Sequence, residues 1–290
     1  MTGKIEETSP LKEGSKRTAE QIELNKKKKA AFKKSVFKSD KWEDLYNKNG
    51  LIVSIHLGRE SNAAKELFNM IIDAADELKL DYDELNFPFK IIDLKIRCML
   101  FCDLDTWDSE LIVNTIFNTI EKSDSQFVKF ITRIVPCKVI PAQMDDIVKN
   151  CIDLMDIKSK TTFAVDFKSR HSEKFKQHHK NKIQIADKIL MHYNGSKQVN
   201  KKEYMKMIKE KQAKNKKKSD DKTEKLTDID DKEEMTIPVL EGQLKVNLTN
   251  PDLLVNVEVM KTICCVSILK NYAKYRKYNV SIIASDGFLQ

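Results

Sequence analysis

The chain has 290 residues and a formal net charge of +8, from 52 basic and 44 acidic side chains. This length is enough to bury one or two hydrophobic cores. Its seven glycines are scattered at positions 3, 14, 50, 58, 195, 242 and 287. Folds that bind dinucleotides, S-adenosylmethionine or acetyl-CoA need clustered glycines, so that the backbone can approach the cofactor. The glycine pattern therefore argues against an enzyme of these classes, and we expect no cofactor.

The cysteine pattern points away from metal binding. None of the six cysteines forms a CxxC pair, and no His/Cys cluster has zinc-finger spacing. The chain shows no secretory leader and no apolar run long enough to span a bilayer, so we expect a reducing, intracellular compartment and no membrane partner. Cys264 and Cys265 would point to opposite faces of a strand. This favours buried packing over a shared metal or a redox pair.

The amino-terminal segment is polar and rich in lysine. Residues 1–49 contain 13 basic and 8 acidic side chains, with lysine runs at 26–29 and 33–34. We expect residues 1–45 to be a largely disordered tail. The lysine runs fit a solubilising tail and, equally, a nuclear targeting signal or a nonspecific RNA-binding arm.

Strand and helix patterns then alternate over 46–126, which predicts a ferredoxin-like α/β unit. We expect strands over 51–57 and near 95–102, and helices over 61–78 and 108–120. In the second helix the inward-facing positions are Leu111, Ile112, Ile116 and Ile120. His56 is a lone histidine, which we interpret as structural. Residues 50–126 contain 7 basic and 15 acidic side chains, a net charge of −8.

A second unit is predicted over 127–283. We expect strands over 127–135 and 161–168, a helix with Pro141 in its first turn, and a later helix stopped by Asn194 and Gly195. Within this unit, residues 195–218 contain 10 basic and 2 acidic side chains, and residues 219–242 contain 3 and 9. These opposite blocks indicate a charged surface insertion over 195–242.

The last strands carry the most informative motif. A turn over 249–252 joins two β segments, and Leu253, Val255, Val257 and Val259 alternate with polar Asn256 and Glu258. This alternation is typical of a half-buried strand. Upstream, the strand over 162–170 reads FxVxxKxR at Phe163, Val165, Lys168 and Arg170.

Together these strands and the VNLTNPD turn resemble the THUMP domain, a module that binds the acceptor end of tRNA. The segments at 50–56, 133–138, 262–268 and 275–279 narrow the resemblance to the eukaryotic THUMP-domain adaptor of tRNA cytidine acetylation. The resemblance covers most of residues 50–280. It implies a noncatalytic protein that holds serine and leucine tRNAs for a separate RNA cytidine acetyltransferase, which forms N4-acetylcytidine in the D arm. With the lysine runs, it also predicts a nuclear, and more narrowly nucleolar, location.

Basic side chains at strand ends and among tyrosines are the candidate RNA contacts. The candidates are Arg133, Lys138, Lys168, Arg170, His171, Asn250, Lys274, Arg276 and Lys277. Asn250 could recognise a ribose hydroxyl, although capping of its own turn is the stronger interpretation. The segment with Lys274, Arg276 and Lys277 fits unpaired bases and a packed amphipathic helix equally well.

Two functional hypotheses remain open from the residues alone. One is the tRNA-binding adaptor, and the other is a general structured-RNA-binding assembly factor or an RNA-modifying enzyme with an unrecognised site. For the adaptor, we expect the acidic residues 50–126 to dock the basic acetyltransferase, unless this unit only braces the RNA-binding domain.

Overall fold

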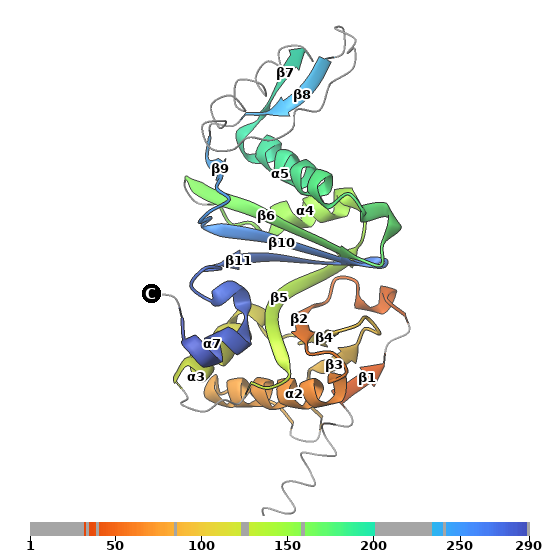
Figure 1. Ribbon diagram of the computed structural model, residues 1–290, viewed down its shortest axis with the longest axis vertical. Coiled ribbons are helices and arrows are strands. Elements are labelled where there is room, and N and C mark those ends of the chain that lie inside the picture. The colour runs from red at the N-terminus through yellow and green to blue at the C-terminus, as the bar shows by residue number, and fades with distance from the viewer. Residues whose placement is uncertain are drawn as a thin grey trace, which may run out of the picture.

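The computed structural model describes residues 32, 35–38, 41–83, 86–122, 128–157, 160–200, 234–239 and 242–288 (Figure 1). The lysine runs at 26–29 and 33–34 and most of the charged insertion lie outside the described residues. The described chain is a mixed α/β fold, as the sequence predicts, and contains one sheet of nine strands in the order β1-β3-β4-β2-β5-β11-β10-β6-β9.

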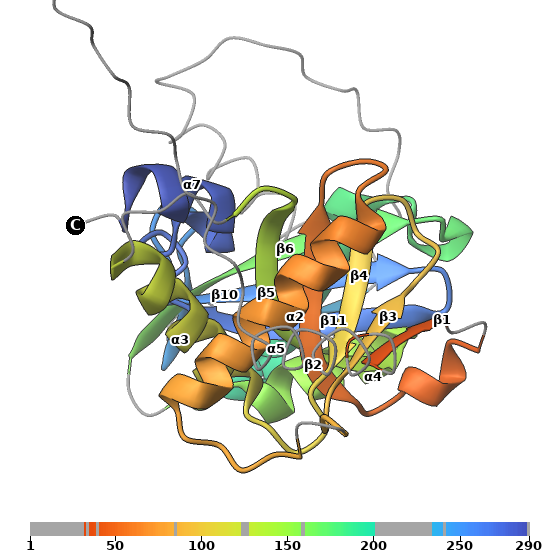
Figure 2. The same cartoon turned by 90° about the horizontal axis from the view of Figure 1, so that it is seen from below.

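The amino-terminal half of this sheet contains four short strands. They are β1 (Val36–Lys38), β2 (Asn49–Ile55), β3 (Lys90–Asp93) and β4 (Met99–Asp103), with the 3-10 turn η1 (Glu43–Leu45) before β2. Helices α2 (Glu60–Glu77) and α3 (Ser109–Lys122) pack against each other here, and Figure 2 shows α2 running across this half. A hydrogen bond of 2.8 Å from the Thr119 hydroxyl to the Glu77 carboxylate joins the two helices.

The carboxy-terminal half is built on longer strands. They are β5 (Ile131–Pro141), β6 (Thr161–Arg170), β9 (Leu244–Val246), β10 (Leu253–Met260) and β11 (Ile263–Lys270). Helix α4 (Met144–Leu154) packs on β11, and α5 (His178–Asn194) packs on β6 (Figure 1). The 3-10 turn η2 (Glu173–Phe175) precedes α5, and the hairpin of β7 (Ser196–Asn200) and β8 (Glu234–Pro238) follows it.

The chain ends in a compact segment after β11. This segment contains the short turn η3 (Arg276–Tyr278) and helix α7 (Val280–Asp286), which packs against α3 and β5. The Asn279 side chain accepts a hydrogen bond of 3.1 Å from the Ile282 backbone N–H, which caps the first turn of α7.

Two hydrophobic cores lie on opposite faces of the carboxy-terminal strands. Val255, Val257 and Cys264 belong to a core under α4 and α5. Leu254 and Cys265 belong to a larger core that extends to α2 and α3. The predicted burial of Cys264 and Cys265 on opposite faces is therefore confirmed.

The predicted half-buried character of β10 is wrong. All eight residues of β10 are buried, including Asn256 and Glu258 on its polar side. The alternation does assign the faces correctly, because Leu253, Val255, Val257 and Val259 share one core. The polar face is covered because Leu254 and Met260, which share it, belong to the larger core that also contains residues of α2, α3 and α7.

Several local expectations also need correction. Pro141 ends strand β5 instead of opening a helix, because its ring also fits the end of an extended strand; α4 begins at Met144. The strand predicted near 95–102 covers only Met99–Asp103, since Lys95 and Cys98 have φ values of 51° and 63°. β3 was missed, and the strand expected over 127–135 is displaced to Ile131–Pro141. Leu111, expected inward on α3, is 47% exposed.

We predict that Gly50→Ala destabilises the fold by about 3 kcal/mol or more, at the upper end of the usual cost of overpacking. A Cβ atom at Gly50 would lie 2.0 Å from the Cys102 carbonyl oxygen, so the β2–β4 pair would have to shift. Gly58→Ala is the matched control, because a Cβ there meets nothing within 4 Å and only the φ of +69° is unfavourable. Urea unfolding of both variants tests this, and equal losses of stability would contradict it.

Candidate nucleic-acid interface

Three of the predicted RNA-contact residues lie at the carboxyl end of strand β6 or directly after it. Lys168 forms an ion pair of 2.8 Å with Asp166, and 37% of the Lys168 side chain is exposed. Arg170 and His171 are exposed at the end of the strand, where His171 has a φ of 54°. The Lys261 N–H donates to the Arg170 carbonyl over 3.1 Å, which ties this end of β6 to the β10–β11 turn.

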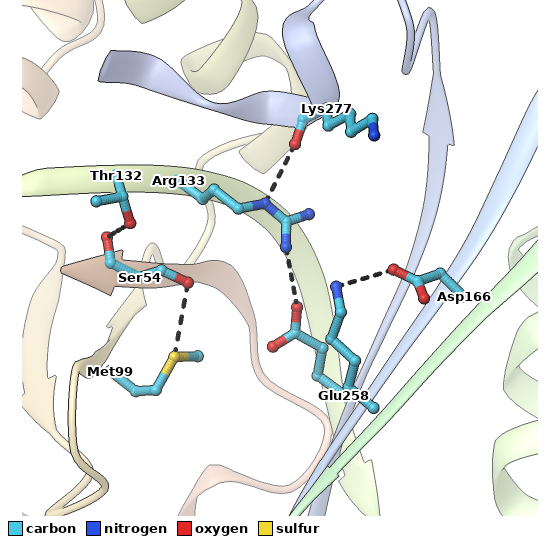
Figure 3. A network of polar contacts seen from close by, with 8 residues as sticks. Ser54, Met99, Thr132, Arg133, Asp166, Glu258 and Lys277 are labelled. Carbon is cyan, nitrogen blue, oxygen red and sulfur yellow. Dashed lines mark hydrogen bonds and ion pairs between the residues drawn. The ribbon is translucent and has the colours of Figure 1, made fainter. Parts of the chain in front are cut away.

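Arg133 lies largely inside the molecule (Figure 3). Its Nε donates a hydrogen bond of 3.1 Å to the Lys277 carbonyl, and its Nη1 lies 3.7 Å from the Glu258 carboxylate. Only 19% of the Arg133 side chain and 4% of the Glu258 side chain are exposed. A charge buried this deeply needs its partner, so truncation of Arg133 would disturb folding before it could report on RNA binding.

The predicted cations of the carboxy-terminal segment are presented by an unusual turn. Arg276, Lys277 and Tyr278 have φ values of 50°, 60° and 61°, in the left-handed region that costs an L residue roughly 1–2 kcal/mol. Lys277 is exposed, and the Lys274 ammonium lies 5.6 Å from the centre of the Phe288 ring. Arg276 is half-buried, and its Nε donates to the Gly287 carbonyl over 3.1 Å.

The tyrosines among these cations pack inward. Tyr275 and Tyr278 make edge contacts with Phe117 of α3, at centroid distances of 5.4 and 5.5 Å. Burial raises the pKa of Tyr278 above its usual range, and the Tyr278 hydroxyl donates to the Lys270 carbonyl over 3.0 Å. In the structure the rings anchor the segment while the side chains of Lys274 and Lys277 are exposed. The structure therefore favours packing for the tyrosines and leaves the lysines available.

A short chain of contacts links the two groups of cations. Lys168 on β6 is the register partner of Glu258 on β10, and Glu258 pairs with Arg133, which bonds Lys277. We call Arg133, Asp166, Lys168, Glu258 and Lys277 the Arg133 network. Tyr272 lies beside it: burial raises the pKa of this phenol, while the charge of Arg133 lowers it.

Two predicted residues lie away from the Arg133 network. Lys138 points to the face of β5 opposite Arg133, because the two are separated by an odd number of strand positions. Asn250 precedes β10, in the turn next to the amino-terminal end of β6. There the Asp252 carboxylate accepts hydrogen bonds from the Thr162 backbone N–H and hydroxyl. It is Asn247 that caps this turn: its side chain bonds the Asn250 N–H and carbonyl.

Sequence reasoning missed three residues that make structural contacts near the candidate side chains. Glu258 was assigned to an exposed polar face, and Asn247 was not considered. Lys261 was also missed; its ammonium lies 4.9 Å from the centre of the Trp42 ring. Of these three residues, only Asn247 could have been found from the sequence. It precedes a turn, and an Asn or Asp side chain often bonds the backbone two or three residues later.

Two further features were sought among the described residues, a metal-binding cluster and a membrane-spanning helix. Within the described ranges, no group of three or more His, Cys, Asp or Glu side chains could hold a metal ion. Among the helices in the part of the chain that the structure describes, none is long and apolar enough to cross a lipid bilayer.

Comparison with known proteins gives one family match. The model of the THUMP domain matches residues 226–269, a range that includes β8 to β11. THUMP domain-containing protein 1 from Mus musculus and from Homo sapiens are each 49% identical to the chain over 47 residues. The matched segment is 16% of this chain and 13% of either relative, so the chain spans about an eighth of the length of the curated relatives it matches.

Solved structures give weaker likenesses. A protein from Pyrococcus horikoshii is 13% identical with a TM-score of 0.43, covering 77% of this chain and 54% of that protein. A 4-thiouridine synthetase in an RNA complex with bound ATP is 11% identical with a TM-score of 0.40, covering 77% and 41%. Scores this low support no argument from shape. On the sequence match of residues 226–269, the chain contains a THUMP domain.

Proposed function

We propose that this chain is a noncatalytic tRNA-binding adaptor. In this proposal it holds serine and leucine tRNAs for an RNA cytidine acetyltransferase that forms N4-acetylcytidine in the D arm. The THUMP match over 226–269 is the observation that carries the proposal, because the same sheet places basic side chains beside the matched strands. We also propose residues 46–126 and 127–283 as the two functional units, and a nuclear, nucleolar location.

The proposed RNA-binding surface combines the end of β6 with the carboxy-terminal turn. Arg170, Lys277 and Lys274 are exposed, and Lys168 is half-exposed. Phosphate contacts dominate nucleic-acid affinity, and arginine can also bond phosphate in a bidentate way. Arg133 is better explained as a support for this surface than as a contact.

The buried thiols argue against cysteine as a catalytic nucleophile. Burial raises the pKa of Cys151 to about 12 and also raises the pKa of Cys102 and Cys264. Thiolates are the reactive form of cysteine, so these thiols are poor nucleophiles. The scattered glycines argue separately against a nucleotide or acetyl-CoA site.

The acidic residues 50–126 supply a second surface for the proposed partner. Asp81, Asp105 and Glu110 are exposed, in a segment with a net charge of −8. An RNA acetyltransferase of positive charge would be attracted to this surface and steered by it.

The tRNA-contact assignment predicts a change in salt dependence. Arg170→Ala and Lys277→Ala should each flatten the slope of log affinity for tRNA against log salt by roughly one, because each removes one phosphate contact. Lys65→Ala, an exposed lysine on α2 within the acidic residues, should leave the slope unchanged. Slopes that match the parent chain in both test variants would place the RNA elsewhere.

The adaptor assignment predicts that the purified chain alone neither binds acetyl-CoA nor acetylates tRNA, and that it stimulates acetylation by its partner. Calorimetry with acetyl-CoA and mass spectrometry of nucleosides from treated tRNA measure these two points. Acetylcytidine formed by the chain without the partner would refute the noncatalytic role. Preferred binding of another structured RNA would favour the assembly-factor hypothesis.

The docking assignment predicts an effect of charge on association. Asp81→Asn with Glu110→Gln should slow association with the acetyltransferase severalfold at low salt, because rim charges act mainly on the association rate. Asp153→Asn with Glu173→Gln removes two exposed acids outside residues 50–126 and should change the rate little. Surface plasmon resonance at two salt concentrations compares the pairs, and equal rates for both would exclude docking through this surface.

A further inference from the structure

Strand β5 leaves a wedge in the sheet. It pairs with β2 through Ile131–Lys138, but with β11 only through Lys138–Pro141. The first half of β5 therefore diverges from the last half of β11, and Figure 1 shows β5 curving away from β11. Backbone groups at the edges of such a wedge need new partners when they are covered.

The carboxy-terminal segment 271–283, which we call the plug, supplies such partners. Asn279 forms an isolated β-bridge with Arg133 on β5. The Ser281 hydroxyl donates to the Ile131 carbonyl over 2.9 Å, and the Tyr278 hydroxyl donates to the Lys270 carbonyl at the end of β11. The plug is therefore joined to both sides of the wedge.

The plug contains the left-handed turn over Arg276–Tyr278. Three consecutive non-glycine residues with positive φ persist only where the surroundings fix them. The turn has its own backbone bonds, from Lys277 N–H to the Tyr272 carbonyl over 2.8 Å and from Tyr278 N–H to the Tyr275 carbonyl over 2.7 Å. Local bonds of this kind leave the direction of the turn relative to the sheet undefined.

Arg133 is the side chain that joins the middle of this turn to the sheet. Its Nε donates to the carbonyl of Lys277, the central residue, and its Nη1 faces buried Glu258 on β10. The planar guanidinium can satisfy both acceptors at a fixed angle, which a lysine ammonium on a flexible stem cannot do as well. Figure 3 shows Arg133 between the Lys277 carbonyl and Glu258.

We propose that Arg133 is a positioning residue, which with Glu258 sets the left-handed turn so that the Lys277 ammonium faces the same RNA as the cations of β6. The RNA in this inference rests on the proposed function. The contacts of Arg133 with Lys277 and Glu258 do not depend on it. Arg133 was predicted to contact RNA directly; in this inference it instead holds the turn that carries Lys277. RNA affinity then depends on the buried pair of Arg133 and Glu258.

The first test is amide hydrogen exchange in a double variant that we call the apolar pair. Arg133→Met with Glu258→Met removes both charges together, so that neither is left buried without its partner. We expect a folded protein in which the amides of Lys277, Tyr278 and Asn279 exchange at least about tenfold faster, whereas amides in the middle of β10 are unchanged. Unchanged exchange in the turn would overturn the proposal.

The second test is a double-mutant cycle with RNA. In the parent chain Lys277→Ala should weaken tRNA binding, whereas in the apolar-pair background it should add less than a twofold change. Lys261→Ala, an exposed lysine outside the plug, is the control and should have the same effect in both backgrounds. Full additivity of Lys277→Ala with the apolar pair would show that Arg133 does not position the turn.

A conservative variant keeps the proposal testable if the apolar pair does not fold. Arg133→Lys retains a cation opposite Glu258 but loses the planar guanidinium that reaches two acceptors. The amides of the turn should therefore still exchange faster than in the parent chain. In this background Lys277→Ala should still have little effect on tRNA affinity. Parent-like exchange in Arg133→Lys would contradict the proposal. If the parent chain binds no tRNA, the proposed function fails, while the exchange experiment still decides whether Arg133 holds the turn.

Discussion

The incomplete pairing of strand β5 shapes the sheet and the segments packed on it. A strand has two hydrogen-bonding edges, and β5 uses one for β2 and only part of the other for β11. This partial pairing joins the two halves of the nine-stranded sheet and at the same time opens the wedge beside β11. The wedge must be closed because buried backbone groups need partners. The plug closes it: Tyr278 is buried there, and Tyr272 lies close enough to buried Glu258 of β10 for their charges to interact.

Residues that depend on local rules could be predicted from the sequence. Helix α2 follows its apolar repeat, and Gly195 stops α5 with a φ of 84°, a conformation that glycine adopts easily. The faces of β10 follow the alternation of its valines. Errors arise where contacts between distant segments decide. Glu258 is buried beside Arg133 of β5, and Leu111 is exposed because α2 and α7 cover other positions of α3. Pro141 fits a strand end and a first helical turn equally well, so only the tertiary structure selects between them.

The candidate interface could be predicted only in part for the same reason. The expected end of a strand indicated Lys168 and Arg170, and the mixture of basic residues and tyrosines indicated Lys277. All three side chains are at least partly exposed. Charge alone cannot distinguish a cation that meets solvent from one that meets a buried acid, as Arg133 shows. Burial of the Arg133–Glu258 pair costs desolvation, so it contributes little to net stability and is better understood as a device that selects one geometry. Lys138 was expected beside Arg133 at a strand end, but β5 continues to Pro141 and the two side chains lie on opposite faces. Asn250 lies at another strand end, which its turn sequence does not reveal.

Identification of what the full chain binds in cells would decide whether it is a tRNA-binding adaptor. The tagged chain would be recovered under native conditions, its RNA sequenced and its protein partners identified by mass spectrometry, with the Arg170→Ala, Lys277→Ala double variant as the control for RNA bound through the proposed surface. We expect serine and leucine tRNAs together with an RNA cytidine acetyltransferase, and loss of the tRNAs in the double variant, as the adaptor proposal requires. Recovery of another class of RNA, or of the same tRNAs in undiminished amount with the double variant, would contradict it.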